Sequence, residues 1–172
     1  MKKRLLSVLL LLALAFTLLP TTALAADTEL PAAVDGVITL TGDVALSTRF
    51  LVNEGESITL DLNGYSITRG SGNETSYLIG VASGSSLTVK DGSPSGTGKI
   101  ESSNFQKAED TSTTYAGYGI LTNGTLRIES GTVSGYYGVF ASGSSAAATL
   151  SGGSVTSSYI GVLVNGGATF NM

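Results

Sequence analysis

Apolar and polar residues alternate in short units along most of the chain, beginning near residue 38. The clearest units place a threonine between two apolar residues, as in Ile58-Thr59-Leu60 and Leu87-Thr88-Val89. Such alternation is typical of a β-strand with one buried face, because successive side chains of a strand point to opposite faces. The units that share this alternation are residues 38–40, 58–60, 87–89, 126–128, 148–150 and 168–170.

Two further sets of apolar positions recur after these units, and turn residues separate the sets. Glycine, asparagine and serine suit such corners, since they tolerate the backbone of tight turns. Each repeat therefore contains three short strands, and the shortest repeats are 20 residues long. The second set contains Val44, Ile67, Ile100, Val133 and Val155, and the third contains Leu51, Val81, Ile120, Val139 and Val162.

Strands that are separated by corners pair most simply with the equivalent strand one repeat later. Parallel connections of this kind are strongly biased to the right-handed form. We therefore predict an all-β fold, a right-handed single-stranded parallel β-helix, which is a three-sheet solenoid of about five coils over residues 37–172. The apolar ends of the units are expected to stack inside in matching order, Ile38 on Ile58 and Ala148 on Ala168, with threonine facing outward.

The first 26 residues have the features of a secretory signal peptide. Lys2, Lys3 and Arg4 precede an apolar run over residues 5–19, and Ala23-Leu24-Ala25 is a small-residue cleavage signal. The apolar run is shorter than the roughly 20 residues that span a bilayer. We predict a secreted or cell-surface protein with no transmembrane span after cleavage, in which residues 27–36 form an N-terminal lead-in or cap.

Composition excludes several classes of site. The chain has no cysteine and no histidine, so disulfides, Cys/His zinc sites and Ser-His-Asp catalysis are absent. Three of the nine cations lie in the predicted signal, which leaves 6 − 13 = −7 as the net charge of the mature chain. This acidic balance argues against a nucleic-acid partner.

The stretch Thr59-Leu60-Asp61-Leu62-Asn63-Gly64-Tyr65-Ser66-Ile67-Thr68 resembles the TLDLNGYTIT signature of secreted bacterial proteins with a pectin-lyase-like right-handed β-helix. Residues 87–93 and 125–133 are similar to the coils that follow this signature, and the resemblance covers residues 36–172. It implies the β-helix fold and a large, adhesin-like surface protein of Gram-positive bacteria, a group that often has no assigned activity.

The related enzymes act on uronic-acid polymers, and their motifs are missing here. The hydrolases use clustered aspartates with a Gly-His-Gly motif, whereas this chain has no histidine and no Asp-Asp pair. The lyases use aspartate-bound calcium and a basic residue. Arg127 stands in the outward column, but Asp61, Lys90 and Glu129 beside it predict an exposed charge ladder. We therefore expect no catalytic residues and no metal site; calcium is possible at Glu109 and Asp110, although no binding-loop spacing indicates it.

Two insertions, residues 68–77 and 102–116, leave the same corner of neighbouring coils and are expected to lie side by side. Functional groups often sit on loops held by a rigid scaffold, and tyrosines near the third strands suit the stacking of sugar rings. We predict that these loops bind extracellular or host glycans. The predicted ligand-binding residues are Arg69, Asn73, Tyr77, Phe105, Lys107 and Tyr115.

Residues 171–172 follow the last alternating unit without a polar cap, which solenoids normally have. We therefore expect a β-helix that is incomplete at its C-terminal end, a fragment of a longer protein. The leading functional hypothesis is a structural or adhesive surface module. The alternatives are a fragment of a polysaccharide lyase or glycoside hydrolase with an incomplete or absent active site, and a surface assembly unit that associates end to end through the open C-terminal coil.

Overall fold

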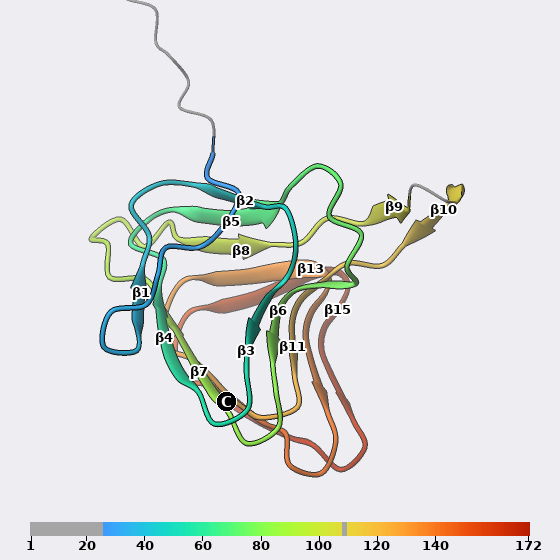
Figure 1. Cartoon of the computed structure of the whole chain (residues 1–172). Helices are drawn as coiled ribbons and strands as arrows, with labels where there is room; N and C mark the ends of the chain where they lie inside the picture. The colour runs from blue at the N-terminus through green and yellow to red at the C-terminus, as the bar shows by residue number, and fades with distance from the viewer. Residues whose placement is uncertain (1–25, 108–109) are drawn as a thin grey trace, which may run out of the picture.

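The computed structural model describes residues 26–107 and 110–172, and this part of the chain consists of strands and turns without a helix (Figure 1). The predicted signal peptide, residues 1–26, lies outside the described residues except for Ala26. The strands stack as flat rungs, so that residues far apart in sequence become neighbours. The described chain is therefore all-β and β-helix-like, with parallel strands in its main sheets.

The alternating units form a six-stranded parallel sheet in the order β1-β4-β7-β12-β14-β16. Each strand pairs with the equivalent strand of the next repeat, as the sequence pattern predicts. The sheet comprises β1 (Val37–Thr39), β4 (Ser57–Asp61), β7 (Ser86–Lys90), β12 (Thr125–Ile128), β14 (Ala147–Leu150) and β16 (Thr169–Asn171).

The second and third sets of strands join into one eight-stranded sheet instead of two separate sheets. The early repeats supply separate strands, whereas β13 (Thr132–Ser142) and β15 (Ser154–Asn165) run through both sets. Their connections are short, and the chain turns the corner at a register shift between Gly135 and Tyr137 without leaving the sheet. The other members are β2 (Val44–Leu46), β3 (Phe50–Val52), β5 (Ser66–Arg69), β6 (Tyr77–Val81), β8 (Lys99–Glu101) and β11 (Tyr118–Thr122).

The predicted register is confirmed in the middle of the alternating sheet and wrong at both ends. Leu87 lies beside Ile58 and Leu126, but Ile38 pairs with Leu60 and not with Ile58. Phe170 likewise pairs with Ala148 in place of Ala168. Both errors are shifts of two residues, which leave the same side chains facing inward because the strand period is two.

The third set contains the same kind of error. Ile79 pairs with Ile120, so Val81 lies beside Thr122 and not beside Ile120 as the glycine pattern predicted. The second set is confirmed throughout, since Ile100 pairs with both Ile67 and Val133. Glycine positions marked corners correctly but did not fix the alignment of the strands that follow them.

Apolar side chains from both sheets fill the narrow interior. The residues of the predicted internal columns are buried in the central coils, among them Ile67, Leu87, Ile100 and Leu126. Neighbouring coils are about 4.8 Å apart, so each side chain packs directly on its equivalents above and below. The predicted outward threonines are also confirmed in these coils, where Thr59 and Thr88 lie side by side and only part of each is buried.

The predicted charge ladder on the outer face exists only in part. Lys90 Nζ lies 3.4 Å from Asp61 Oδ2 on the neighbouring strand. Glu129 instead pairs within its own segment, 2.7 Å from Arg127 Nε. Arg127 is therefore a surface ion-pair partner, a role that contributes little to stability because both groups face solvent.

The corner between β7 and β8 is held by one carboxylate. Asp91 accepts hydrogen bonds from the backbone nitrogens of Gly64 at 2.8 Å and Gly98 at 2.6 Å, and thereby links two coils. Desolvation alone would raise the pKa of Asp91, but hydrogen bonds from Gly98, Ser93 and Gly64 outweigh it and lower the pKa below its usual value.

This corner predicts a specific acid sensitivity. The folded-state pKa of Asp91 lies below the unfolded-state value, so its stabilising effect is complete above about pH 4 and is lost as the pH falls through the folded pKa. Urea unfolding of Asp91→Asn is expected to show lower stability at pH 7 and a weaker loss of stability on acidification than the parent. Glu54→Gln, at an exposed turn, is the control. An Asp91→Asn protein with the parent's pH profile would contradict the assignment.

Candidate functional site

The two insertions predicted from the sequence lie side by side and are tied together by Arg69 at the end of β5. Its guanidinium Nε donates to Ser103 O at 3.1 Å and Nη2 donates to Ser102 Oγ at 3.0 Å, which reaches the second insertion. Nη1 donates to Thr75 O at 2.6 Å within the first insertion. Burial lowers the pKa of Arg69 from its ordinary value. Arg69 thus connects both insertions through hydrogen bonds.

Asn73 is almost completely buried, with 3% of its surface exposed. Its Nδ2 donates to Leu46 O at 2.9 Å, and its Oδ1 accepts bonds from Arg69 Nη1 and from the Thr75 hydroxyl. Every polar atom of this side chain therefore has a partner inside the protein. Asn73 shapes the first insertion from within and offers no free group to a ligand.

The second insertion contains an antiparallel hairpin, β9 (Phe105–Lys107) and β10 (Asp110–Tyr115). The Phe105 and Tyr115 rings stack with centroids 5.5 Å apart. Arg69 lies 4.5 Å from the centroid of Phe105, and Lys107 lies 4.8 Å from that of Tyr115. These cation–π contacts cover the ring faces that a sugar would need for stacking.

Hydrogen bonds also close this hairpin at its far end. Bonds from Thr113 and Ser112, with a further one from Tyr115, lower the pKa of Asp110 to about 2. The Ser112 hydroxyl donates to Asp110 Oδ1 at 2.7 Å. Asp110 is therefore ionised under ordinary conditions, and its carboxylate is engaged with Ser112, Thr113 and Tyr115 of its own strand.

Tyr77 starts β6 and lies outside this hairpin stack. Arg49 lies 5.1 Å from the centroid of its ring. The ring covers the strand at Gly80, where an added Cβ would lie 2.7 Å from Tyr77 Cε2. Of the six predicted residues, Phe105, Lys107 and Tyr115 line one cavity of about 420 Å³ together with Arg49, Glu74 and Tyr118.

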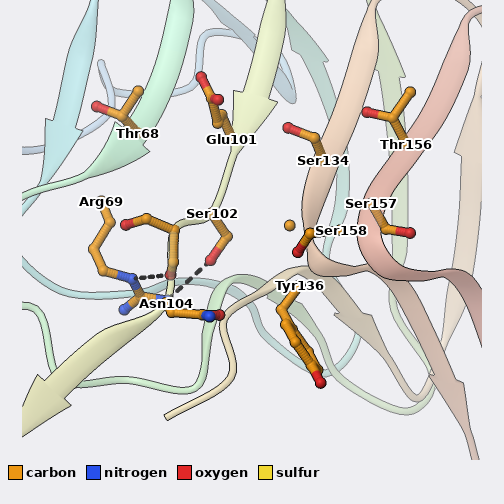
Figure 2. Close-up of a pocket in the computed structure, with 12 residues that line it drawn as sticks. Thr68, Arg69, Glu101, Ser102, Asn104, Ser134, Tyr136, Thr156, Ser157 and Ser158 are labelled. Atoms are coloured by element: carbon orange, nitrogen blue, oxygen red, sulfur yellow. Dashed lines mark hydrogen bonds between the residues drawn. The ribbon is translucent and has the colours of Figure 1, made fainter. Parts of the chain in front are cut away.

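A second hollow of about 440 Å³ lies where both insertions leave the sheet (Figure 2). Its floor is a row of outward side chains on four neighbouring strands, because Thr68 pairs with Glu101, Glu101 with Ser134 and Ser134 with Thr156. We call this hollow the hydroxyl groove. Its lining residues are Thr68, Arg69, Glu101, Ser102, Ser103, Asn104, Ser134, Gly135, Tyr136, Thr156, Ser157 and Ser158.

The groove combines many hydrogen-bonding groups with little charge. Glu101 is its one carboxylate among the lining residues, and Lys99 Nζ lies 2.6 Å from it. Sequence reasoning found Arg69 but missed Glu101, Ser134 and Thr156, which lie in ordinary strand positions. These residues could have been recognised only from their alignment across β5, β8, β13 and β15. Finding that alignment requires the register of the second set of strands.

A cluster of tyrosines borders the groove on the third set of strands. Tyr118 stacks on Tyr137 at 4.7 Å, and Tyr136 stacks on Tyr159 at 4.9 Å. Tyr136 and Tyr137 meet edge to face at 5.1 Å. Desolvation and the neighbouring phenols raise the pKa of Tyr137. We call Tyr118, Tyr136, Tyr137 and Tyr159 the tyrosine cluster. Its rings stack on one another, and three of them are partly buried, whereas Tyr159 is exposed.

The described residues contain no group of three or more His, Cys, Asp or Glu side chains arranged to hold a metal ion. Within residues 26–107 and 110–172 there is also no long apolar helix of the kind that crosses a membrane. Comparison with protein-family models, with curated proteins and with solved structures finds no match. The chemistry of the site must therefore be argued from its own residues.

The loop geometry predicts that Asn73 is a structural residue. Asn73→Ala removes the side-chain hydrogen bonds to Leu46 O, Arg69 and Thr75 from a buried site, although Leu46 O keeps its bond from Gly70 N, so the free energy of unfolding is expected to fall by about 1–3 kcal/mol. Asn171→Ala, on the exposed surface of β16, is the matched control and is expected to change it little. Urea unfolding of both variants measures the difference, and equal stabilities would contradict this role.

Proposed function

We propose that this chain is a secreted or cell-surface structural and adhesive module that binds glycans at the corner where segments 68–77 and 102–116 leave the sheet. Its scaffold is a right-handed parallel β-helix of about five coils, of the pectin-lyase-like kind. The parallel pairing of equivalent strands supports this scaffold, and the strong bias of parallel crossovers supports the right-handed form.

The hydroxyl groove is the observation that carries the proposal. Serine, threonine and asparagine side chains donate and accept hydrogen bonds without net charge, which matches the hydroxyl groups of a sugar. The groove crosses four neighbouring strands of one sheet. A ligand with hydroxyl groups repeated along its length would meet a similar set of partners on each strand.

The same groove supports binding more than hydrolysis. Most glycoside hydrolases use two carboxyl groups that flank the scissile bond. Glu101 is the one carboxylate among the residues that line the hydroxyl groove. Lys99 Nζ lies 2.6 Å from Glu101 Oε2, so this carboxylate already has a cationic partner on its own strand.

The insertions then act chiefly as the walls of the site. Arg69 belongs both to the groove and to its walls. It lines the groove, and its hydrogen bonds hold the two insertions together. Phe105 is only 8% exposed and packs inside the second insertion. Among the predicted residues, Lys107 and Tyr115 line the neighbouring cavity and remain candidates for direct contact with a ligand there, whereas Tyr77 is not among its lining residues.

The proposal is tested by filling the groove. Thr156 is exposed at one end of the row on β15, and Thr156→Trp places a large ring across the hollow. The chain without its predicted signal peptide is first screened against neutral and acidic glycans. For each glycan that binds, Thr156→Trp is expected to weaken the affinity about tenfold or more, a change of about 1.4 kcal/mol.

Thr169→Trp is the matched control, because Thr169 is an exposed threonine of β16, which belongs to the other sheet. It is expected to leave the affinity unchanged. Absence of binding to every glycan in the screen would contradict the proposed function. Binding that both tryptophan variants retain would place the ligand outside the hydroxyl groove.

A further inference from the structure

Two rings of the tyrosine cluster are stacked face to face, and one of them is exposed to solvent. Tyr136 on β13 and Tyr159 on β15 are stacked with their rings 17° from parallel and their centroids 4.9 Å apart. They belong to neighbouring strands that run parallel. Tyr159 is 61% exposed, so an oxidant in solution reaches it directly. Tyr136 lies beneath it at the edge of the hydroxyl groove.

The composition of the chain directs oxidation toward these rings. Cysteine, histidine and tryptophan are absent from the sequence, and the two methionines are Met1 and Met172. Tyrosine is therefore the main one-electron donor in the body of the fold. The cluster holds four of the seven tyrosines within contact of one another, so a radical formed on one ring has a second phenol beside it.

Stacking is also the approach that carbon–carbon coupling needs. The unpaired electron of a tyrosyl radical occupies π orbitals that project above and below the ring, with density at the carbons ortho to the oxygen. A bond between two such carbons therefore forms across facing rings. An edge-to-face pair, such as Tyr137 and Tyr159 with ring planes 89° apart, lacks this overlap.

We propose that Tyr136 and Tyr159 form an oxidative cross-linking site that joins two neighbouring coils through a dityrosine bond. The oxidant is hydrogen peroxide, used by a heme peroxidase. Each phenol loses one electron and one proton, and the two ortho carbons form the new carbon–carbon bond. The hydrogen on each of these carbons then moves to the phenol oxygen. The balance is two tyrosines and one hydrogen peroxide giving one dityrosine and two waters.

The bond would act as a covalent staple in a protein that has no cysteine for disulfides. It closes a segment of 159 − 136 = 23 residues, and a cross-link of this kind stabilises mainly by restricting the unfolded chain. Tyr118 and Tyr137 are stacked as well, at 4.7 Å. Both of these rings are partly buried, whereas Tyr159 is exposed, so coupling is expected at Tyr136 and Tyr159 and not at Tyr118 and Tyr137. The inference does not depend on glycan binding.

The test uses the whole chain at low protein concentration with a heme peroxidase and hydrogen peroxide. The parent is expected to give dityrosine fluorescence in the monomer fraction and an intact monomer mass lowered by two hydrogen atoms. Tyr136→Phe and Tyr159→Phe keep the ring stack but remove the phenol, and each is expected to reduce the monomer signal to background. Tyr65→Phe, outside the tyrosine cluster, is the control and is expected to react like the parent.

Two results would overturn the assignment. Dityrosine found only in covalent dimers would show that the stacked pair does not couple within one molecule. A monomer signal that persists in Tyr159→Phe would place the bond on another pair. The cross-linked parent is also expected to have a higher thermal midpoint than the untreated protein, and this shift is expected to vanish in both cluster variants.

Discussion

Hydrogen bonding between equivalent strands of successive repeats is the constraint on which the rest of the structure depends. Outside the hairpin of β9 and β10, a strand is three to twelve residues long and obtains its backbone partners from neighbouring repeats. Because the pairing is parallel, each residue lies beside its equivalent about 4.8 Å away. Interior positions are then mostly apolar, with exceptions such as the buried Thr122, and the outer face displays rows of aligned side chains. The floor of the hydroxyl groove is such a row.

Alternation and turn residues were sufficient to predict the parallel stacking and the buried positions of the first two sets of strands in the central coils, because a pattern of period two leaves little freedom for the inner face. In the third set, Leu51 was placed in line with Val81, but it pairs with Gly80 and is 39% exposed, whereas Val52 is buried. The alignment between coils was less determined. Ile38 and Phe170 are each displaced by two residues from the predicted neighbours, and the burial pattern is the same for either alignment. Phe170 beside Ala148 combines a large and a small side chain, a choice that depends on volume and not on period.

The candidate site could be predicted from the sequence only in its position. Insertions 68–77 and 102–116 were recognisable as additions to the repeat, and their common corner followed from the topology. Their internal contacts did not follow, because Asn73 and Phe105 have polar or aromatic side chains that look accessible in sequence but are buried in the folded loops. The Thr68-Glu101-Ser134-Thr156 row joins residues from four repeats, and it becomes visible only when the strands are aligned.

Rigidity connects the proposed roles. Arg69 fixes the insertions against one another, and the stacked tyrosines fix neighbouring coils on the adjoining strands. A preorganised surface loses less conformational freedom when it binds an extended ligand. The scaffold therefore favours recognition by a fixed pattern of hydroxyl groups over a site that closes around its ligand.

The register of the second set of strands is the central claim, because the groove exists only if Ile67, Ile100 and Val133 lie on neighbouring strands. The most direct measurement is a nuclear Overhauser experiment on the isotopically labelled chain. The account predicts cross-strand contacts of a parallel pair between Ile67 and Ile100, and between Ile100 and Val133. Contacts in which Ile100 pairs instead with a residue of its own repeat, or in an antiparallel pattern, would contradict the stacked-coil structure.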